Sequence, residues 1–127
     1  MRFLFTALMF VSQIQIFATS CFTNDKLQQS WNEQMLKLAS VELVKKNQSV
    51  SVLIKMPKKF EGHTLKDVAV LTGQLENLES LYTLKHYEEN GEMFAHYFVN
   101  EKWIEQQTIE VTYGSECGPR AMFSVVR

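Results

Sequence analysis

The chain has 127 residues, of which 46% are hydrophobic and 21% are charged, and its formal net charge is −1. These proportions are typical of one small globular domain and exclude a disordered chain. The near-neutral balance also excludes a strongly basic nucleic-acid-binding protein, so we expect no nucleic acid among its partners.

Residues 1–20 have the layout of a secretory signal peptide. Arg2 is followed by the apolar run Phe3–Val11, and the small residues Ala18 and Ser20 stand before a cleavage point. The apolar run is shorter than the roughly 20 residues that a helix needs to span a bilayer. We therefore expect export to the periplasm or the extracellular space, with residues 21–127 forming a single domain.

Cys21 would be the first residue after this cleavage, and its side chain could be modified in two ways. The only other cysteine is Cys117, and an even number of cysteines in an exported chain favours a disulfide between the two. The alternative is an outer-membrane lipoprotein, with Cys21 carrying the lipid as the only contact with a membrane. Ala18 stands where such signals usually carry leucine, which weakens this alternative.

A helical pattern begins just after Cys21. Thr23 or Asn24 can cap its start. An apolar stripe at helical spacing follows, made of Leu27, Trp31, Met35 and Leu38. Polar residues fill the opposite face, namely Gln28, Gln29, Asn32 and Glu33. We expect this helix to pack Trp31 against a sheet.

From Ser40 onward the apolar period changes to two, which indicates strands. About seven are expected, near residues 41–46, 49–56, 67–72, 81–88, 93–99, 108–113 and 121–126. Asn90-Gly91 suits the type I′ turn of a two-residue hairpin. The pattern predicts a mainly β fold, an immunoglobulin-like antiparallel β-sandwich with an N-terminal α-helix. The alternative is an α+β roll, in which the helix covers one curved sheet.

His86, Met93 and His96 flank the Asn90-Gly91 turn and form a weak metal-site candidate. A two-residue loop puts His86 opposite Ala95, so that the two histidines point to opposite faces. A three-residue bulged loop would instead place His86 opposite His96 with Met93 nearby, as a copper-type site requires. Ordinary sheet histidines are the simpler interpretation, and we expect neither metal nor cofactor.

Gly114-Ser115-Glu116-Cys117-Gly118 does not match the G-x-S-x-G nucleophile motif. A catalytic Cys117 would need a nearby base, and nothing in the sequence places one there. No other catalytic constellation is present, so we do not expect an enzyme.

Lysines gather between residues 45 and 66, where the only acidic residue is Glu61. They are a candidate anion-binding patch made of Lys45, Lys46, Lys55, Lys58, Lys59 and Lys66. The alternative is a solvated strand edge, on which lysines discourage edge-to-edge aggregation. Asn47-Gln48-Ser49 is an N-glycosylation acceptor, which matters only in a eukaryotic host.

The sequence thus favours an exported, non-enzymatic binding or structural module of the cell envelope or extracellular space. Its partner would be a protein or an anionic glycan or lipid surface. The competing hypothesis is a periplasmic copper-type carrier, or a small thiol-dependent enzyme centred on Cys117.

Overall fold

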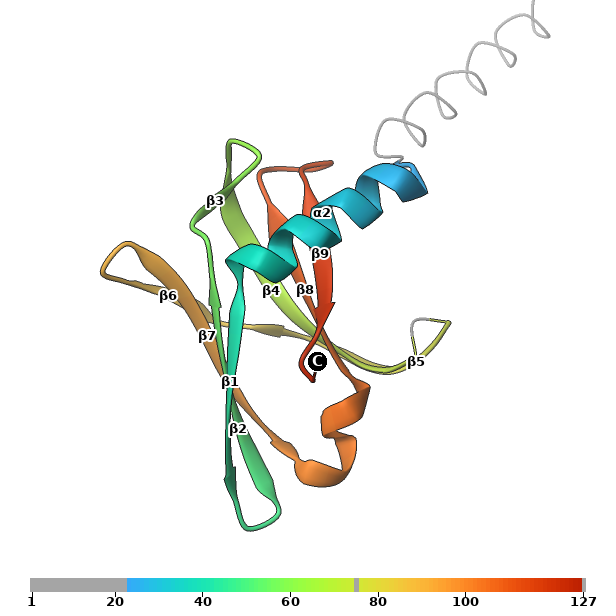
Figure 1. The fold of residues 1–127 in the computed structure, drawn as a ribbon, viewed down its shortest axis with the longest axis vertical. Helices are drawn as coiled ribbons and strands as arrows, with labels where there is room; N and C mark the ends of the chain where they lie inside the picture. The colour runs from blue at the N-terminus through green and yellow to red at the C-terminus, as the bar shows by residue number, and fades with distance from the viewer. Residues whose placement is uncertain (1–22, 75, 127) are drawn as a thin grey trace, which may run out of the picture.

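The computed structural model describes residues 23–74 and 76–126, and the predicted signal peptide and Cys21 lie outside them. One helix, nine strands and one 3-10 helix form within the described residues (Figure 1). In chain order they are α2 (Asp25–Leu38), β1 (Ser40–Lys46), β2 (Ser49–Met56), β3 (Lys59–Phe60), β4 (His63–Gln74), β5 (Asn77–Leu84), β6 (His86–Glu89), β7 (Glu92–Asn100), η1 (Glu101–Gln106), β8 (Gln107–Tyr113) and β9 (Arg120–Ser124).

The strands form two antiparallel sheets that pack together. One sheet has the order β1-β2-β7-β6, and the other has the order β3-β4-β8-β9 with β5 also paired to β4. The fold is therefore mainly β and sandwich-like with an N-terminal helix, and not the single curved sheet of the α+β roll. No helix among residues 23–74 and 76–126 is long and apolar enough to cross a membrane.

Two hairpins have the same kind of turn. Asn90 and Gly91 have φ of 53° and 82°, and Glu89 pairs with Glu92, so the predicted two-residue hairpin is confirmed. Glu61 and Gly62, with φ of 52° and 78°, join β3 to β4 in the same way. This second hairpin was not predicted, because β3 has two residues and is too short to show a period of two.

The single strand expected near residues 81–88 is in fact two strands. β5 pairs with β4 of the five-stranded sheet, whereas β6 pairs with β7 of the other sheet. The chain crosses from one sheet to the other at Lys85, between Leu84 and His86. Residues 81–88 contain no Gly, Pro, Asn or Asp that would mark a break, so the sequence alone could not reveal the change of partner.

The core lies between the inner faces of the two sheets. β2 contributes Val50, Val52, Ile54 and Met56, and β8 contributes Ile109, Val111 and Tyr113, all of them buried. The Tyr113 hydroxyl also donates to the Pro57 carbonyl at 2.7 Å, which ties β8 to the loop that follows β2 of the opposite sheet.

Helix α2 differs from the sequence prediction in the face that it buries. Asn24 caps it, its Oδ1 accepting from the Leu27 amide at 2.8 Å. Met35 is buried and Trp31 half-buried against the core, but the flanking members of the predicted stripe, Leu27 and Leu38, are exposed.

The face of α2 that contacts β9 includes two half-buried side chains that were expected on the helix face opposite the apolar stripe. Asn32 Oδ1 accepts from the Met122 amide at 2.9 Å, and Gln28 Nε2 donates to the Arg120 carbonyl at 2.8 Å. Both backbone groups belong to β9, the edge strand of its sheet. The helix thus lies along β9 and supplies hydrogen-bond partners that this edge strand lacks (Figure 1).

Candidate functional site

The outer face of the four-stranded sheet carries a group of aromatic and apolar side chains. On β2 and β7 the inward positions are buried, whereas the alternate positions Ser51, Leu53, Phe94, His96 and Phe98 point away from the core. The register aligns Val44 of β1 with Ser51 and Phe98, and Tyr87 of β6 with Phe94. We call these residues the outer face: Val44, Ser51, Leu53, Tyr87, Phe94, His96 and Phe98.

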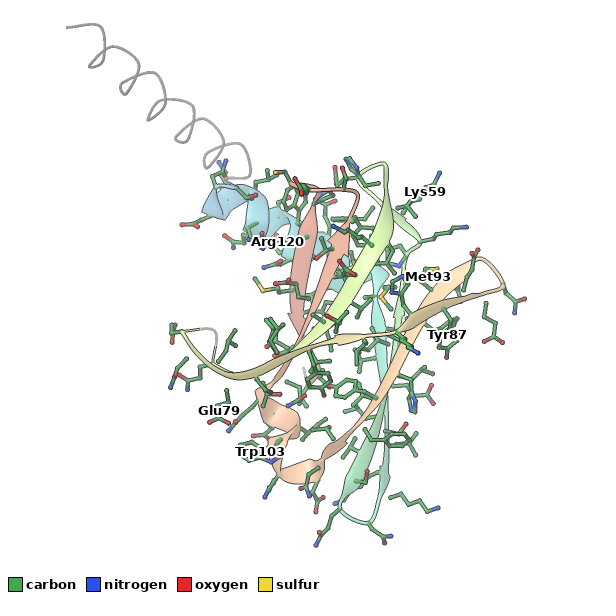
Figure 2. All side chains as sticks on the ribbon, turned by 180° about the vertical axis from the view of Figure 1, so that it is seen from behind. Lys59, Glu79, Tyr87, Met93, Trp103 and Arg120 are labelled. Carbon is green, nitrogen blue, oxygen red and sulfur yellow. The ribbon has the colours of Figure 1, made fainter. Side chains whose placement is uncertain are left out.

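The rings on the outer face form two contacting pairs. Tyr87 and Phe94 stack with ring centroids 5.7 Å apart and planes inclined by 22°. His96 and Phe98 meet edge to face with centroids 4.7 Å apart. A His96 ring nitrogen, Nε2, also lies 2.6 Å from the Ser51 hydroxyl. These contacts hold the rings in a preorganised strip. The strip ends at Tyr87, which lies on the β6–β7 hairpin (Figure 2).

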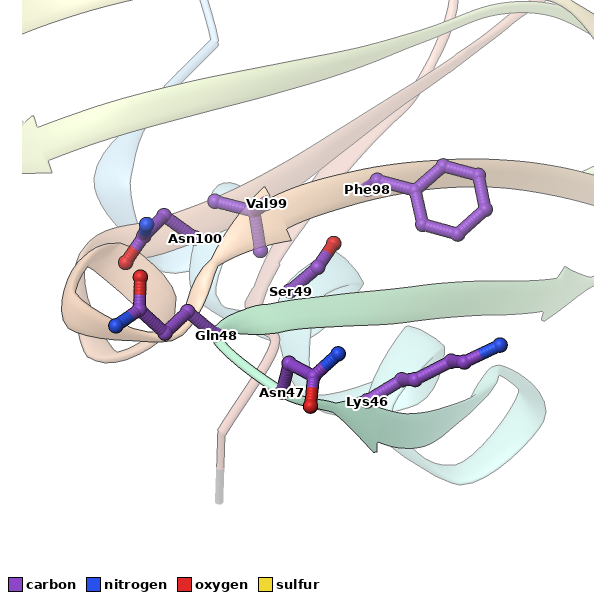
Figure 3. Close-up of a pocket in the computed structure, with 7 residues that line it drawn as sticks. All are labelled: Lys46, Asn47, Gln48, Ser49, Phe98, Val99 and Asn100. Carbon is purple, nitrogen blue, oxygen red and sulfur yellow. The ribbon is translucent and has the colours of Figure 1, made fainter.

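Phe98 is the most exposed large hydrophobic side chain of the described residues, at 66% exposure. Its ring lines a pocket of about 380 Å³ at the β1–β2 turn. The rest of the lining is polar apart from Val99, and consists of Lys46, Asn47, Gln48, Ser49 and Asn100. Figure 3 shows Lys46 on β1 and Phe98 on β7, the two strands that flank β2, with Asn47 and Gln48 at the β1–β2 turn and Asn100 at the end of β7.

This pocket combines an apolar ring face with many hydrogen-bonding groups. Three carboxamides and one hydroxyl can donate and accept, one ammonium can donate, and no carboxylate is among the described residues that line the pocket. Asn100 Oδ1 already accepts from the Lys102 amide at 3.1 Å, which fixes the orientation of its amide group. The arrangement suits a ligand that carries both an apolar face and several hydroxyl or acidic groups.

The six lysines predicted to form an anion patch have different partners, and the patch itself stays a prediction. Three of them form ion pairs, namely Lys45 with Glu101, Lys55 with Glu92 and Lys58 with Glu88. Lys46 lines the pocket at the β1–β2 turn, and Lys66 lines another pocket beside Cys117. Lys59 lies at the β3–β4 hairpin (Figure 2). Of the six, Lys46 lines the pocket beside Phe98, and Lys55 lies on the outward side of β2 opposite Phe94.

The structure places the histidine candidates on two faces. His86 lies opposite Ala95, as the two-residue loop predicts, and therefore points to the inner side together with Met93. His96 points to the outer face. Among residues 23–74 and 76–126, no group of three His, Cys, Asp or Glu side chains is arranged to hold a metal ion.

Cys117 sits in an exposed turn with φ of 65°. A Cβ on the next residue, Gly118, would overlap the Tyr113 carbonyl, so only glycine fits this close approach. Cys117 shares a pocket of about 230 Å³ with Thr23, Lys66 and Arg120. The pairing with Cys21 stays a prediction because Cys21 lies outside the described residues.

Sequence reasoning missed the aromatic outer face. A signal was present in β7, where Phe94, His96 and Phe98 alternate with the buried Met93, Ala95 and Tyr97. A half-buried strand normally carries polar residues at alternate positions, so rings on both faces indicate that the outer face has a use.

Comparisons of the chain with protein-family models, with curated proteins and with solved structures find no match. The function is therefore argued from the chemistry of the outer face and its pocket.

Proposed function

We propose that the protein is an exported, non-enzymatic binding module of the cell envelope or extracellular space that holds a glycan on the outer face. The observation that carries this proposal is the Phe98 ring, 66% exposed at the mouth of a pocket lined by amides and an ammonium. A group of exposed apolar side chains with polar residues around it, unlike a single exposed residue, is typical of a binding surface.

A sugar fits both the exposed aromatic ring and the polar lining of the pocket. The C–H face of a pyranose ring stacks on an aromatic ring, while its hydroxyls accept and donate hydrogen bonds to carboxamides. Because Lys46 is the only charged residue among the described residues that line the pocket, an acidic sugar is favoured over a basic one. The strip from Phe98 through His96 to Phe94 and Tyr87 offers further stacking positions, so an anionic polysaccharide fits better than a single sugar.

A protein partner fits this surface less well. The exposed rings are interrupted by Ser51 and His96, which hydrogen-bond to each other, and the adjoining pocket is mostly polar. The centre of a protein interface is usually more apolar and excludes water.

We also propose that the sandwich has an immunoglobulin-like architecture. Two packed antiparallel sheets support this, and the architecture suits a recognition module. An experimental structure that gives the strand connections of another sandwich class would contradict it.

Co-sedimentation with insoluble polysaccharides tests the proposed function. Cross-linked polygalacturonate serves as the acidic glycan, and chitin serves as the neutral one. Wild-type protein should sediment with the glycan, more strongly with the acidic one, and Phe98→Ala should weaken binding by about tenfold or more, equivalent to ~1.4 kcal/mol.

Leu81→Ala is the matched control. Leu81 is 61% exposed and lies on β5 of the other sheet, so its loss removes a similar apolar area outside the site. Equal binding by wild type and Phe98→Ala, or binding of neither glycan, would contradict the proposal. A soluble protein from an envelope extract that is captured through Phe98 would indicate the protein partner instead.

A further inference from the structure

Strand β1 ends its sheet and has a free edge. It pairs with β2 on one side over all seven of its residues, and no strand of the described residues pairs with its other side. Val44 is 55% exposed in the middle of this strand, and Leu43 is exposed beside it. A long, exposed edge of this kind is a template for a further strand.

The charges along β1 are arranged around Val44. Glu42 and Lys46 lie two residues to either side of it, and all three side chains point to the outer face because their β2 partners do so. Neither Glu42 nor Lys46 forms an ion pair with another of residues 23–74 and 76–126. The edge therefore carries an apolar centre with one negative end and one positive end.

We propose that β1 pairs antiparallel with β1 of a second copy, about a two-fold axis that passes through Val44. This register places Val44 opposite Val44 of the second copy and places Glu42 opposite Lys46 twice. The opposite charges and the paired valines stabilise such a cross-strand arrangement.

Neighbouring registers are less favourable. A shift in one direction centres the axis on Leu43 and leaves Glu42 opposite Val44. A shift in the other direction centres it on Lys45, where two like charges meet. The charge pattern of β1 thus selects a single pairing.

The dimer would join two outer faces into one surface. A two-fold axis perpendicular to the sheet keeps both outer faces on the same side, and β2 and β7 follow β1 on each copy. With strands about 4.8 Å apart, five intervals separate the two β7 strands, so the two Phe98 side chains would lie about 24 Å apart. The ammonium of Lys46 has three donors and can contact both Glu42 of the second copy and a ligand.

Charge reversal combined with measurement of molar mass tests the pairing. Light scattering after size exclusion should give twice the monomer mass for wild-type protein at concentrations of tens of micromolar. Glu42→Lys alone and Lys46→Glu alone should each give the monomer mass, because each puts two like-charged pairs at the interface. An equimolar mixture of these two variants should restore the dimer mass, because both cross-strand pairs are again opposite in sign.

Glu79→Lys is the control, since it makes the same change on the exposed strand β5 of the other sheet. It should remain dimeric, and circular dichroism should show that every variant is folded. A monomeric wild type, single variants that stay dimeric, or a mixture that fails to reassociate would each overturn the proposal. The readout is mass, so a failure of the dimer and a failure of glycan binding are distinguishable.

Discussion

At the scale of single residues, Gln107 is a polar side chain in the core that requires hydrogen-bond partners. It is 1% exposed, and it is the one buried polar side chain of the described residues. Its Oε1 accepts from the Tyr97 hydroxyl at 3.2 Å, and its Nε2 donates to Thr72 Oγ1 at 3.0 Å and to the Trp103 carbonyl at 3.2 Å. One side chain therefore joins β4, β7, β8 and η1 through fully satisfied hydrogen bonds.

We predict that Gln107→Leu lowers the free energy of unfolding by about 2–3 kcal/mol, because Tyr97, Thr72 and Trp103 each lose a partner in the core. Urea unfolding measures this. Tyr97→Phe removes only one of the bonds and should cost about 1 kcal/mol. Equal stabilities of wild type and Gln107→Leu would show that the network contributes nothing.

Two buried tyrosines predict how stability depends on pH. Burial raises the pKa of the Tyr113 phenol, and burial together with the nearby Tyr82 raises the pKa of Tyr97, both well above the ordinary value of 10.0. In the unfolded chain these phenols titrate near that ordinary value, so their stabilising contribution is complete below it and is lost as the pH rises further. We expect the free energy of unfolding to fall above about pH 10.

The slope of this fall should be about 1.4 kcal/mol per pH unit for each of the two phenols. Urea unfolding between about pH 8 and pH 11 measures it. Tyr113→Phe should flatten the slope, and Tyr87→Phe controls for the loss of a surface hydroxyl. A stability that is constant over this range would contradict the prediction.

At the scale of elements, α2 protects an edge strand as well as burying an apolar face. Gln28 and Asn32 bond to backbone groups of β9, which would otherwise face water or another chain. This differs from β1, whose edge is free in the described residues.

Asn32→Ala should therefore speed hydrogen exchange at the Met122 amide and lower the free energy of unfolding by about 1–2 kcal/mol. Gln34→Ala is the control, since Gln34 bonds only to Ser30 on the exposed side of the same helix. An unchanged exchange rate at Met122 would mean that the amide is protected by something other than Asn32.

The sequence patterns predicted the helix and the strands better than they predicted which strands pair with each other. Six of the seven expected strands are present as single strands, and the Asn90-Gly91 turn and the Asn24 cap form as predicted, because each depends on local chemistry. The crossing at Lys85 depends on which strand pairs with which, and the role of Asn32 depends on an edge 90 residues away in the chain. Contacts between residues far apart in the sequence leave no pattern in a short stretch of it.

The candidate site was predictable only in part for the same reason. Lys46 was singled out for its charge, but Phe98 was not, since its role arises from exposure on the outer face and from the pocket formed with the β1–β2 turn. Three of the six lysines are paired with carboxylates of η1, β7 and β6, and no local sequence pattern predicts these pairs.

At the scale of the whole molecule, the predicted Cys21–Cys117 disulfide would link the start of the domain to its last hairpin. Thr23 and Cys117 line the same pocket, and Cys21 is only two residues, at most about 7 Å of chain, from Thr23. This proximity supports the pairing.

We predict that the intact mass of protein exported by its native host corresponds to residues 21–127 with one disulfide. Cys117→Ser should then cost about 4–5 kcal/mol of stability according to the loop-entropy model. A mass that includes acyl chains on Cys21 would support the lipoprotein instead, and a mass that retains residues 1–20 would contradict the cleavage.

The most direct test of the central claim, that the outer face binds a glycan, is NMR mapping with an acidic oligosaccharide such as a galacturonate oligomer. The account predicts amide shifts at Ser51, His96 and Phe98, together with Gln48 in the turn, that saturate with ligand concentration. The outward positions Glu110 and Thr112 of the other sheet should not shift. Shifts confined to that other sheet, or no saturable shifts at all, would contradict the account.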